Sequence, residues 1–505
     1  MAEPIVHDLV GVGIGPFNLS LAALADAAPG LSALFLDAKP AFSWHPGLLL
    51  DGTVLQVPFL ADLVTLADPT SRWTYLNYLR EHDRMFPFFF SERFHIPRRE
   101  YDHYCRWVAN SLPSCRFGAQ VTDITPDEGA SALAVTFRSG PGSATTRVLA
   151  RQVVLGVGTQ PVVPQPLRRY VRAAAHAGRV LHSADYRTHR AELARARDVT
   201  VVGGGQSGAE IVLDLLRHYT EPDPRPDPRP HPGAHPRPHP GAETAPDTAP
   251  ETAPAPEPGA AGERGPHGGP FVRWVARTPA FAPMEYSKIG LEHFTPDYVR
   301  YFRALPEDRR DQLLARQWQL YKGVSEETLA DIHDLLYERT IGGAPAPASL
   351  HPGVTVAGIS ALEEGGYELA CRHDEQGTSF TVRTDAVVSA TGYAAVRPPF
   401  LDGMVKLIDW DEKGRYRIDG SYRVALEPGV PGALYVQNAE LHTHGVGAPD
   451  LTLGAWRAAT ILNAVAGRTV LRVPEQAAWT TFGAPPPDVR GPALPGGAGD
   501  AAQPG

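Results

Sequence analysis

The chain has 505 residues, and its 43% hydrophobic content is ordinary for a globular protein. That length exceeds one small core, so two or three domains are expected. The formal net charge of −9 argues against a general nucleic-acid or membrane-surface role. The three cysteines lack metal spacing, and the N-terminus lacks a basic leader and an apolar signal core. We therefore expect a cytoplasmic protein with reduced thiols and no metal, nucleic-acid or membrane partner.

The first 37 residues have the order of a dinucleotide-binding βαβ unit. An apolar run at 5–10 predicts a buried strand, and a glycine-rich turn follows at 11–15. Helical spacing at 19–28 and a second apolar run at 33–36 complete the unit, which ends on Asp37. We interpret this segment as a nucleotide site rather than an ordinary tight turn.

Each part of the turn has a physical role. Gly11 allows the tight turn, and Gly13 lets the backbone approach a pyrophosphate. The helix N-terminus presents free N–H groups and a partial positive charge to that anion. Pro16 stands where the pattern has its third glycine, and it suits a first helical turn because the missing N–H had no partner there. Asp37 is expected to accept hydrogen bonds from a ribose.

A second nucleotide unit lies in the middle of the chain. A strand is predicted at 198–202, an unbroken G-x-G-x-x-G follows at 203–208, and a helix follows at 209–218. The next strand of the unit is predicted at 271–275. Just beyond it stands Arg277, at a position where an acid suits NAD and an arginine suits the 2′-phosphate of NADP.

A proline-rich insert at 221–270 interrupts the second unit. It holds 16 of the 50 prolines and offers no apolar surface for a core, so we expect a disordered or polyproline-like linker. Its histidines, His231, His235 and His239, fit a solvated linker better than a metal site. We expect the insert to be dispensable for the reaction, because longer loops add little closure entropy.

The other predicted elements are less diagnostic. A segment at 39–69 fits equally a packed irregular loop and an aromatic wall for a cofactor ring. The remaining predictions are helices at 75–81, 101–112 and 451–466, strands at 153–157, 381–389 and 433–436, a region of loop and helices at 283–338, and a disordered tail at 485–505.

Two dinucleotide sites indicate a flavin and a nicotinamide that exchange hydride. A disulfide reductase would need a redox cysteine pair, which the sequence lacks. A nucleotide-binding redox sensor without catalysis would not need two sites that feed each other, so we favour a flavin monooxygenase. The predicted fold class is α/β with two Rossmann-like domains, for FAD and NADPH, the second inserted in the first. The expected boundaries are 1–190 and 341–480 for the FAD domain and 191–340 for the NADPH domain.

These motifs resemble those of the flavin-dependent N-hydroxylating monooxygenases of siderophore pathways, which act on lysine, ornithine or diamines. The likeness covers the glycine loops, Trp44 to Gly47, Leu55 and Gln56, and His444 to Thr452. Residues 385–398 resemble the family's Asp-x3-Leu/Phe-Ala-Thr-Gly-Tyr-x4-His/Pro motif, with Ser389 in place of the usual Leu or Phe.

The resemblance implies a reaction and roles for particular residues. NADPH would reduce FAD, O2 would form a C4a-hydroperoxyflavin, and a neutral primary amine would become a hydroxylamine. The catalytic residues would be Gln56 near the flavin and Arg98 on the nicotinamide side, the alternatives being a buried structural amide and a surface arginine paired with Glu100. The cofactor-binding residues would be Gly11, Gly13, Gly15, Pro16, Phe17, Asn18, Asp37, Trp44, His45, Gln56, Val121, Gly203, Gly205, Gln206, Ser207, Gly208, Arg277, Thr391, Gly392, Tyr393, Pro449, Asp450 and Leu451.

One departure from the family bears on the substrate. In its amino-acid hydroxylases a lysine commonly stands where this chain has Ala61, and it pairs with the substrate carboxylate. The expected substrate is therefore a diamine, cadaverine or putrescine, with L-lysine or L-ornithine as the alternative. Residues expected to contact substrate are Ala61, Glu285, Tyr321 and Thr452, with Glu285 a candidate acceptor for the distal ammonium. Homo-oligomers, either dimers or tetramers, are expected.

Overall fold

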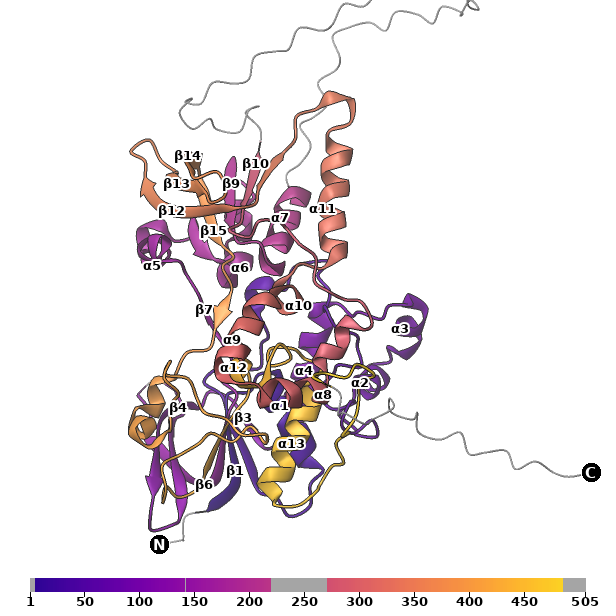
Figure 1. Ribbon diagram of the computed structural model, residues 1–505, viewed down its shortest axis with the longest axis vertical. Coiled ribbons are helices and arrows are strands. Elements are labelled where there is room, and N and C mark those ends of the chain that lie inside the picture. Colours follow the sequence, from indigo (N-terminus) through magenta and orange to yellow (C-terminus); the bar gives the residue numbers. More distant parts are fainter. Residues whose placement is uncertain (1–4, 141, 219–269, 485–505) are drawn as a thin grey trace, which may run out of the picture.

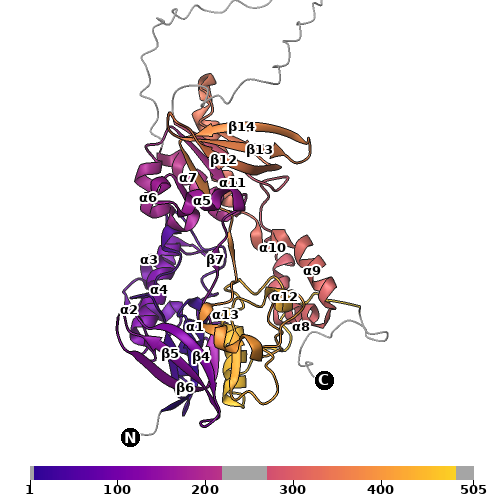
Figure 2. The ribbon, with the colours of Figure 1, turned by 90° about the vertical axis from the view of Figure 1, so that its left-hand side faces the viewer.

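The computed structural model describes residues 5–140, 142–218 and 270–484. The predicted tail lies outside these residues, as does the predicted insert apart from Pro270. Two α/β domains lie one above the other (Figure 1), and three helices occupy one side between them (Figure 2). We call the domain that contains β1 the first domain and the domain that contains β9 the second domain. Within the described residues no helix is both long and apolar enough to cross a bilayer.

The first domain is built on a seven-stranded sheet of order β3-β2-β1-β6-β5-β4, with β17 beside β6. The strands β1, β2, β3, β6 and β17 pair in parallel, and β4 and β5 form an antiparallel extension. Helices α1 and α13 lie side by side against this sheet (Figure 1). The strands are β1 Val6–Val12, β2 Ala33–Leu36, β3 Cys115–Arg116, β4 Gln120–Asp127, β5 Ala132–Arg138, β6 Thr145–Leu155 and β17 Ala433–Val436, and the helices are α1 Pro16–Asp26, α2 Tyr75–Glu81, α3 Met85–Ser91, α4 Arg98–Ser111, α12 Leu441–His444 and α13 Gly454–Ala466.

The second domain holds a five-stranded parallel sheet of order β11-β10-β9-β15-β8. A separate antiparallel sheet of β12, β13 and β14 packs on it through a shared apolar core. The strands are β8 Val180–His182, β9 Asp198–Val202, β10 Phe271–Val275, β11 Ala348–His351, β12 Val354–Ala361, β13 Tyr367–His373, β14 Thr378–Thr384 and β15 Ala386–Ser389, and the helices are α5 Arg168–Arg172, α6 Tyr186–Leu193, α7 Gln206–His218 and α11 Glu326–Arg339.

The chain crosses between the domains at a short antiparallel ribbon. Strand β7, Gln160–Pro161, leads into the second domain, and β16, Tyr393–Ala394, leads back beside it (Figure 2). The three helices between the domains are α8 Pro296–Ala304, α9 Glu307–Arg316 and α10 Trp318–Lys322. They share a small apolar core with α12 and Val446.

The predicted fold class is confirmed, but the predicted domain boundaries differ from the sheet pairing. Strand β8 precedes the expected boundary at 190, yet it pairs with β15. Strands β11 and β15 follow the expected boundary at 340, yet they pair with β10 and β9. The boundaries were misplaced because nothing in a short apolar run indicates which of two sheets the strand joins. The predicted strand at 381–389 is likewise two strands, which belong to different sheets.

Candidate active site between the two domains

The first glycine loop has the shape of a pyrophosphate cradle. Gly13 has φ of +88°, and a Cβ there would lie 2.5 Å from the Gly156 carbonyl oxygen. A side chain at Gly11 would overlap the Phe35 ring. Helix α1 begins at Pro16 after Gly15, and no side chain caps its first turn. Its free N–H groups therefore remain for an anion, as expected for a dinucleotide.

Side chains of the first domain itself hold this loop. The Ile14 N–H donates to Asp37 Oδ2 over 2.7 Å, and the Lys39 N–H donates to Oδ1 over 2.8 Å. The buried Asn18 amide donates to the carbonyls of Val12, Gly13 and Val154, and Gln437 donates to its oxygen. Asn18 therefore shapes the loop from behind, while the predicted ribose contact of Asp37 stays a prediction.

Phe17 at the start of α1 is fixed by a buried cation. The Arg457 guanidinium lies 4.1 Å from the centre of the Phe17 ring, and it forms an ion pair with Glu440. Both charged side chains are almost fully buried. The C-terminal segment thus locks the first turn of α1 in place.

Aromatic rings form a partly open wall near the domain crossing. The His45 ring lies edge-on to Trp44 and Tyr393, with centroid separations of 5.2 and 5.7 Å. His45 itself has φ of +44°, which turns the chain sharply before the 3₁₀ helix Pro46–Leu48. Segment 391–393 lies where the chain returns from the second domain, and the Thr391 hydroxyl donates to the Val162 carbonyl.

The second glycine loop is as tightly built as the first. Gly203 has φ of +132°, and a side chain there would overlap the Ala390 carbonyl. A side chain at Gly208 would overlap the Gly203 carbonyl, so only glycine allows this close helix–strand packing. The Thr278 hydroxyl is buried beside Gly204 with no hydrogen-bond partner among the described residues. An unsatisfied buried hydroxyl at this loop fits a polar ligand that completes it.

The second loop reaches the first domain through Gln206 and Gln56. The Gln56 amide donates to Gln206 Oε1 over 3.2 Å and lies 3.2 Å from Met284 Sδ. Gln206 Oε1 also accepts from the Ser325 N–H over 2.7 Å. The half-buried Gln56 therefore stands at the junction of the first domain, the second loop and the segment at 283–287.

Arg98 and Glu210 form a second bridge between the domains. Arg98 Nη1 lies 2.9 Å from Glu210 Oε2 on α7, and their side chains are 12% and 4% exposed. Burial raises the pKa of Glu210, while the charge of Arg98 opposes that shift. The alternative of a surface arginine paired with Glu100 is wrong, because Glu100 pairs with Arg84. Gln206 donates to the other Glu210 oxygen over 2.8 Å, so both bridges are joined.

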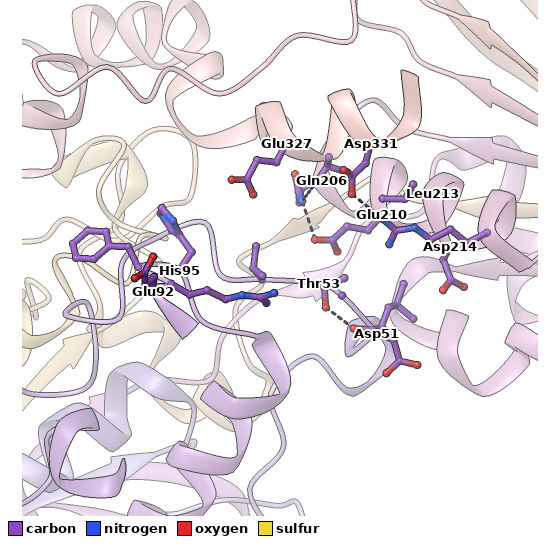
Figure 3. Close-up of a pocket in the computed structure, with 17 residues that line it drawn as sticks. Asp51, Thr53, Glu92, His95, Gln206, Glu210, Leu213, Asp214, Glu327 and Asp331 are labelled. Carbon is purple, nitrogen blue, oxygen red and sulfur yellow. Dashed lines mark hydrogen bonds and ion pairs between the residues drawn. The ribbon is translucent and has the colours of Figure 1, made fainter. Parts of the chain in front are cut away.

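These two bridges border a cavity of about 420 Å³ between the domains (Figure 3). Glu210 and Gln206 face it from α7, and Asp51 and Thr53 face it from the first domain. Two of its other carboxylates have arginine partners, Asp331 with Arg217 at 2.8 Å and Asp214 with Arg190 at 2.6 Å. The cavity wall therefore carries more carboxylates than arginines.

Two of the segments that carry residues expected to contact substrate lie side by side. The Met284 N–H donates to the Val324 carbonyl over 2.8 Å, which places 283–287 beside 320–325. Ala61 is 4% exposed and lies in the same loop as Gln56. Tyr321 is half-buried, and its pKa is raised by burial. The Thr452 N–H donates to Asp450 over 2.7 Å.

Other predicted residues lie at the edges of this arrangement. Glu285 is exposed, and hydrogen bonds from the Ser287 hydroxyl and from the Ser287 N–H, the latter over 2.7 Å, lower the pKa of its carboxyl. Arg277 is exposed just past β10. Val121 is buried in β4, Gly205 and Ser207 lie at the start of α7, and Pro449 and Leu451 flank Asp450.

Sequence reasoning missed two residues of the site, Glu210 and Thr278. Glu210 lies four residues after Gln206, on the same face of a helix, so its helical spacing was an available signal. Thr278 follows Arg277, but nothing in the sequence shows that its hydroxyl is buried against the glycine loop.

Comparison with known proteins identifies the family. The model of the L-lysine 6-monooxygenase/L-ornithine 5-monooxygenase family matches residues 5–224 and 264–395. The chain belongs to this family. The gap between the two matched segments, residues 225–263, falls within the predicted insert.

The relatives match over nearly the whole chain. The rhizobactin siderophore biosynthesis protein RhbE of Rhizobium meliloti is 42% identical over 95% of each chain. The putrescine N-hydroxylase of Shewanella oneidensis is 36% identical over 94% of this chain and 84% of that protein. The FAD-bound crystal structure of DfoA, the cadaverine monooxygenase of Erwinia amylovora, is 33% identical with a TM-score of 0.81, covering 95% of this chain and 99% of that one. This family member is thus a monooxygenase whose relatives serve siderophore biosynthesis.

Proposed function

We propose that this enzyme uses NADPH and O2 to N-hydroxylate one terminal amine of a diamine, cadaverine or putrescine, for a hydroxamate siderophore. The observation that carries the substrate class is Ala61, which is buried and supplies neither charge nor donor. A substrate carboxylate at that place would lose its hydration without gaining a partner, at a cost of several kcal/mol. The putrescine hydroxylase and the cadaverine monooxygenase among the relatives support the same class.

The two glycine loops fit the proposed cofactors. For FAD, the uncapped first turn of α1 and the close approach at Gly13 fit a pyrophosphate. For NADPH, the buried free hydroxyl of Thr278 and the exposed Arg277 lie at the second loop. An arginine there suits the extra phosphate that distinguishes NADPH from NADH.

When bound and reduced, the flavin supplies the oxygen-activating chemistry. The chain positions the reactants around it. The Gln56 amide donates to Gln206 at the second glycine loop. Glu210 holds Arg98 through Nη1, so that the remaining N–H groups of Arg98 can orient the nicotinamide. Ala61 is buried, and Tyr286 and Tyr321 are half-buried, which limits water at the site and favours the neutral amine, whose pKa is otherwise near ~10.4.

The distal ammonium of a diamine needs an acceptor. Glu285 is exposed and bound to Ser287, so it is poorly placed for this purpose. Asp450 is a better candidate: burial and the Asp450 carboxylate raise the pKa of the half-buried Tyr286, and the charge of Arg98 lowers it, so Asp450 lies near both side chains. We assign the ammonium contact to Asp450 and leave Glu285 at the edge of the site. We also propose that the subunits form homo-oligomers.

Steady-state turnover with a substrate panel tests the proposed function. NADPH consumption and hydroxylamine formation are measured together for cadaverine, putrescine, lysine and ornithine. We expect tight coupling and the highest kcat/KM for one of the diamines. A tenfold preference for lysine or ornithine, about 1.4 kcal/mol in transition-state binding, would overturn the diamine assignment. A redox sensor would form no hydroxylamine with any of the four.

Ala61→Lys provides the matched variant. The new ammonium should repel the diamine and lower its kcat/KM by tenfold or more, while the flavin content stays the same. If lysine turnover rises in the same variant, Ala61 is confirmed as the position that selects the substrate class.

A further inference from the structure

Helix α3 carries an apolar surface that faces solvent. The α3 aromatic patch consists of Met85, Phe86, Phe89, Phe90 and Phe94. Its four phenylalanines are between 53% and 74% exposed. Helix α3 has no buried residue, and it lies at the outer edge of the molecule in both views (Figures 1 and 2).

The rings of the patch form an ordered cluster. Phe86 and Phe90 stack with their centroids 6.3 Å apart, and Phe89 meets Phe90 edge-on at 5.4 Å. Phe88, on the inner side of the helix, packs against Phe59 and Tyr75. Positions 86, 89 and 90 therefore point outward at the i, i+3, i+4 spacing that normally marks a buried helix face.

The exposed area is large for an unpartnered surface. A phenylalanine carries roughly 150–250 Å² of buriable area, so the four rings expose about 400–700 Å². This area is at or above the ~300–600 Å² of the largest apolar patch on a typical soluble monomer, and such a patch is often functional. A standard protein interface buries about 800 Å² on each partner, and the patch with its flanking polar residues approaches that value.

We propose that the α3 aromatic patch is a self-association surface, on which α3 of one subunit packs against α3 of a second copy around a twofold axis. The same surface then occurs on both partners, as an isologous contact requires. This inference rests on the proposed homo-oligomer and names its surface.

The composition around the patch favours a second copy over other occupants. Arg80 pairs with Glu81 and Arg84 pairs with Glu100 beside the helix, and Glu92 and Arg93 follow it, so the rim contains both signs of charge and can complement a copy of itself. A membrane surface attracts clusters of one sign, and the net charge of −9 opposes anionic lipid. The segment 221–269 contains no large apolar residue, so it offers little to bury against four phenylalanines.

The patch is also continuous with the site. The Phe59 N–H donates to the Phe94 carbonyl, and the Leu55 N–H donates to the Ile96 carbonyl over 2.9 Å. The extended segment 55–59, which carries Gln56, is therefore hydrogen-bonded to the segment 94–96, which begins with Phe94 of the patch. Self-association at α3 would stiffen this support from outside.

Sedimentation velocity of the full-length, flavin-loaded enzyme tests the proposal over a concentration series. The unmodified enzyme should sediment as a dimer or a larger oligomer. Phe89→Glu places two charges face to face at the twofold axis and should reduce the assembly to monomers, or a tetramer to dimers. Tyr337→Glu is the matched control, since Tyr337 on α11 is 69% exposed but lies outside the patch. Bound flavin and the unfolding temperature show that each variant is folded.

Cross-linking keeps the proposal testable if Phe89→Glu does not fold. Phe90→Cys should give a covalent dimer with a short bismaleimide, and Tyr337→Cys should not. A monomeric unmodified enzyme would overturn both the oligomer and this surface. An oligomer that Phe89→Glu leaves intact, or that Phe90→Cys does not cross-link, would overturn the surface alone. Vesicle binding by a monomeric enzyme that is lost in Phe89→Glu would instead assign the patch to a membrane.

Discussion

The glycine loops at 11–15 and 203–208 share one strand–turn–helix geometry but differ in what holds them. Around the first loop, Asp37, Asn18 and Gln437 all belong to the first domain, and each of them forms at least one buried hydrogen bond. The first nucleotide site is therefore complete once that domain has folded.

The second loop depends on the other domain. Its Gln206 accepts from Gln56, and Glu210 on the same helix pairs with Arg98. Gln56 and Arg98 both belong to the first domain. The second nucleotide site is therefore complete only when the two domains lie in this arrangement, which makes use of the second cofactor sensitive to contacts between domains.

Breaking the first loop should have the largest effect. In Gly13→Ala the new Cβ would lie 2.5 Å from the Gly156 carbonyl at a φ of +88°, so the loop must move. We expect flavin affinity to fall by 100-fold or more, about 3 kcal/mol, and the purified variant to contain little flavin. Gly30→Ala is the control, because Gly30 has φ of +80° but open space around it. Normal flavin content in Gly13→Ala would show that the cradle is elsewhere.

Changing the charge at the second loop should have an intermediate effect. Arg277→Ala should raise KM for NADPH by about tenfold, or 1.4 kcal/mol, and leave KM for NADH nearly unchanged. Arg316→Ala removes an exposed arginine on α9 and should change neither value. Equal use of NADPH and NADH by the unmodified enzyme would remove the role assigned to Arg277.

Acid should weaken the binding of NADPH at the second site. Because burial raises the pKa of Glu210, this carboxyl takes up a proton at a higher pH than an exposed glutamate. A raised pKa in the folded state means that protonation relieves a folding cost as the pH falls, but it also weakens the hold on Arg98. KM for NADPH should therefore rise a few-fold between neutral pH and about pH 5. The matched variant Glu210→Gln should show a flat profile, and a slope that persists in it would point to another group.

The sequence predicted the parts that rest on local patterns. Both glycine loops, Pro16 at the start of α1, and strands β2, β9, β10 and β17 stand at or within two residues of where they were predicted. These features follow from steric needs of a few neighbouring residues, which a single sequence displays.

The sequence did not predict the parts that rest on contacts far along the chain. Arg98 was expected on the nicotinamide side, but its partner Glu210 lies 112 residues away. Strand β15 was assigned to the first domain, yet it pairs with β8 and β9. Long-range pairing of this kind leaves no local signal. The outward orientation of the phenylalanines of α3 is also not visible in the sequence, because their apolar pattern by itself predicts a buried helix.

A double-mutant cycle on Arg98 and Glu210 tests most directly that the second site is completed across the domain boundary. The rate of flavin reduction by NADPH is followed without O2 in the unmodified enzyme, in Arg98→Met, in Glu210→Gln and in the double variant. Each single change should slow reduction by at least tenfold with flavin content unchanged, and Glu210→Gln should add nothing once Arg98 is gone. If the two effects multiply in the double variant, Glu210 and Arg98 act independently, and the pair does not complete the second site across the domain boundary.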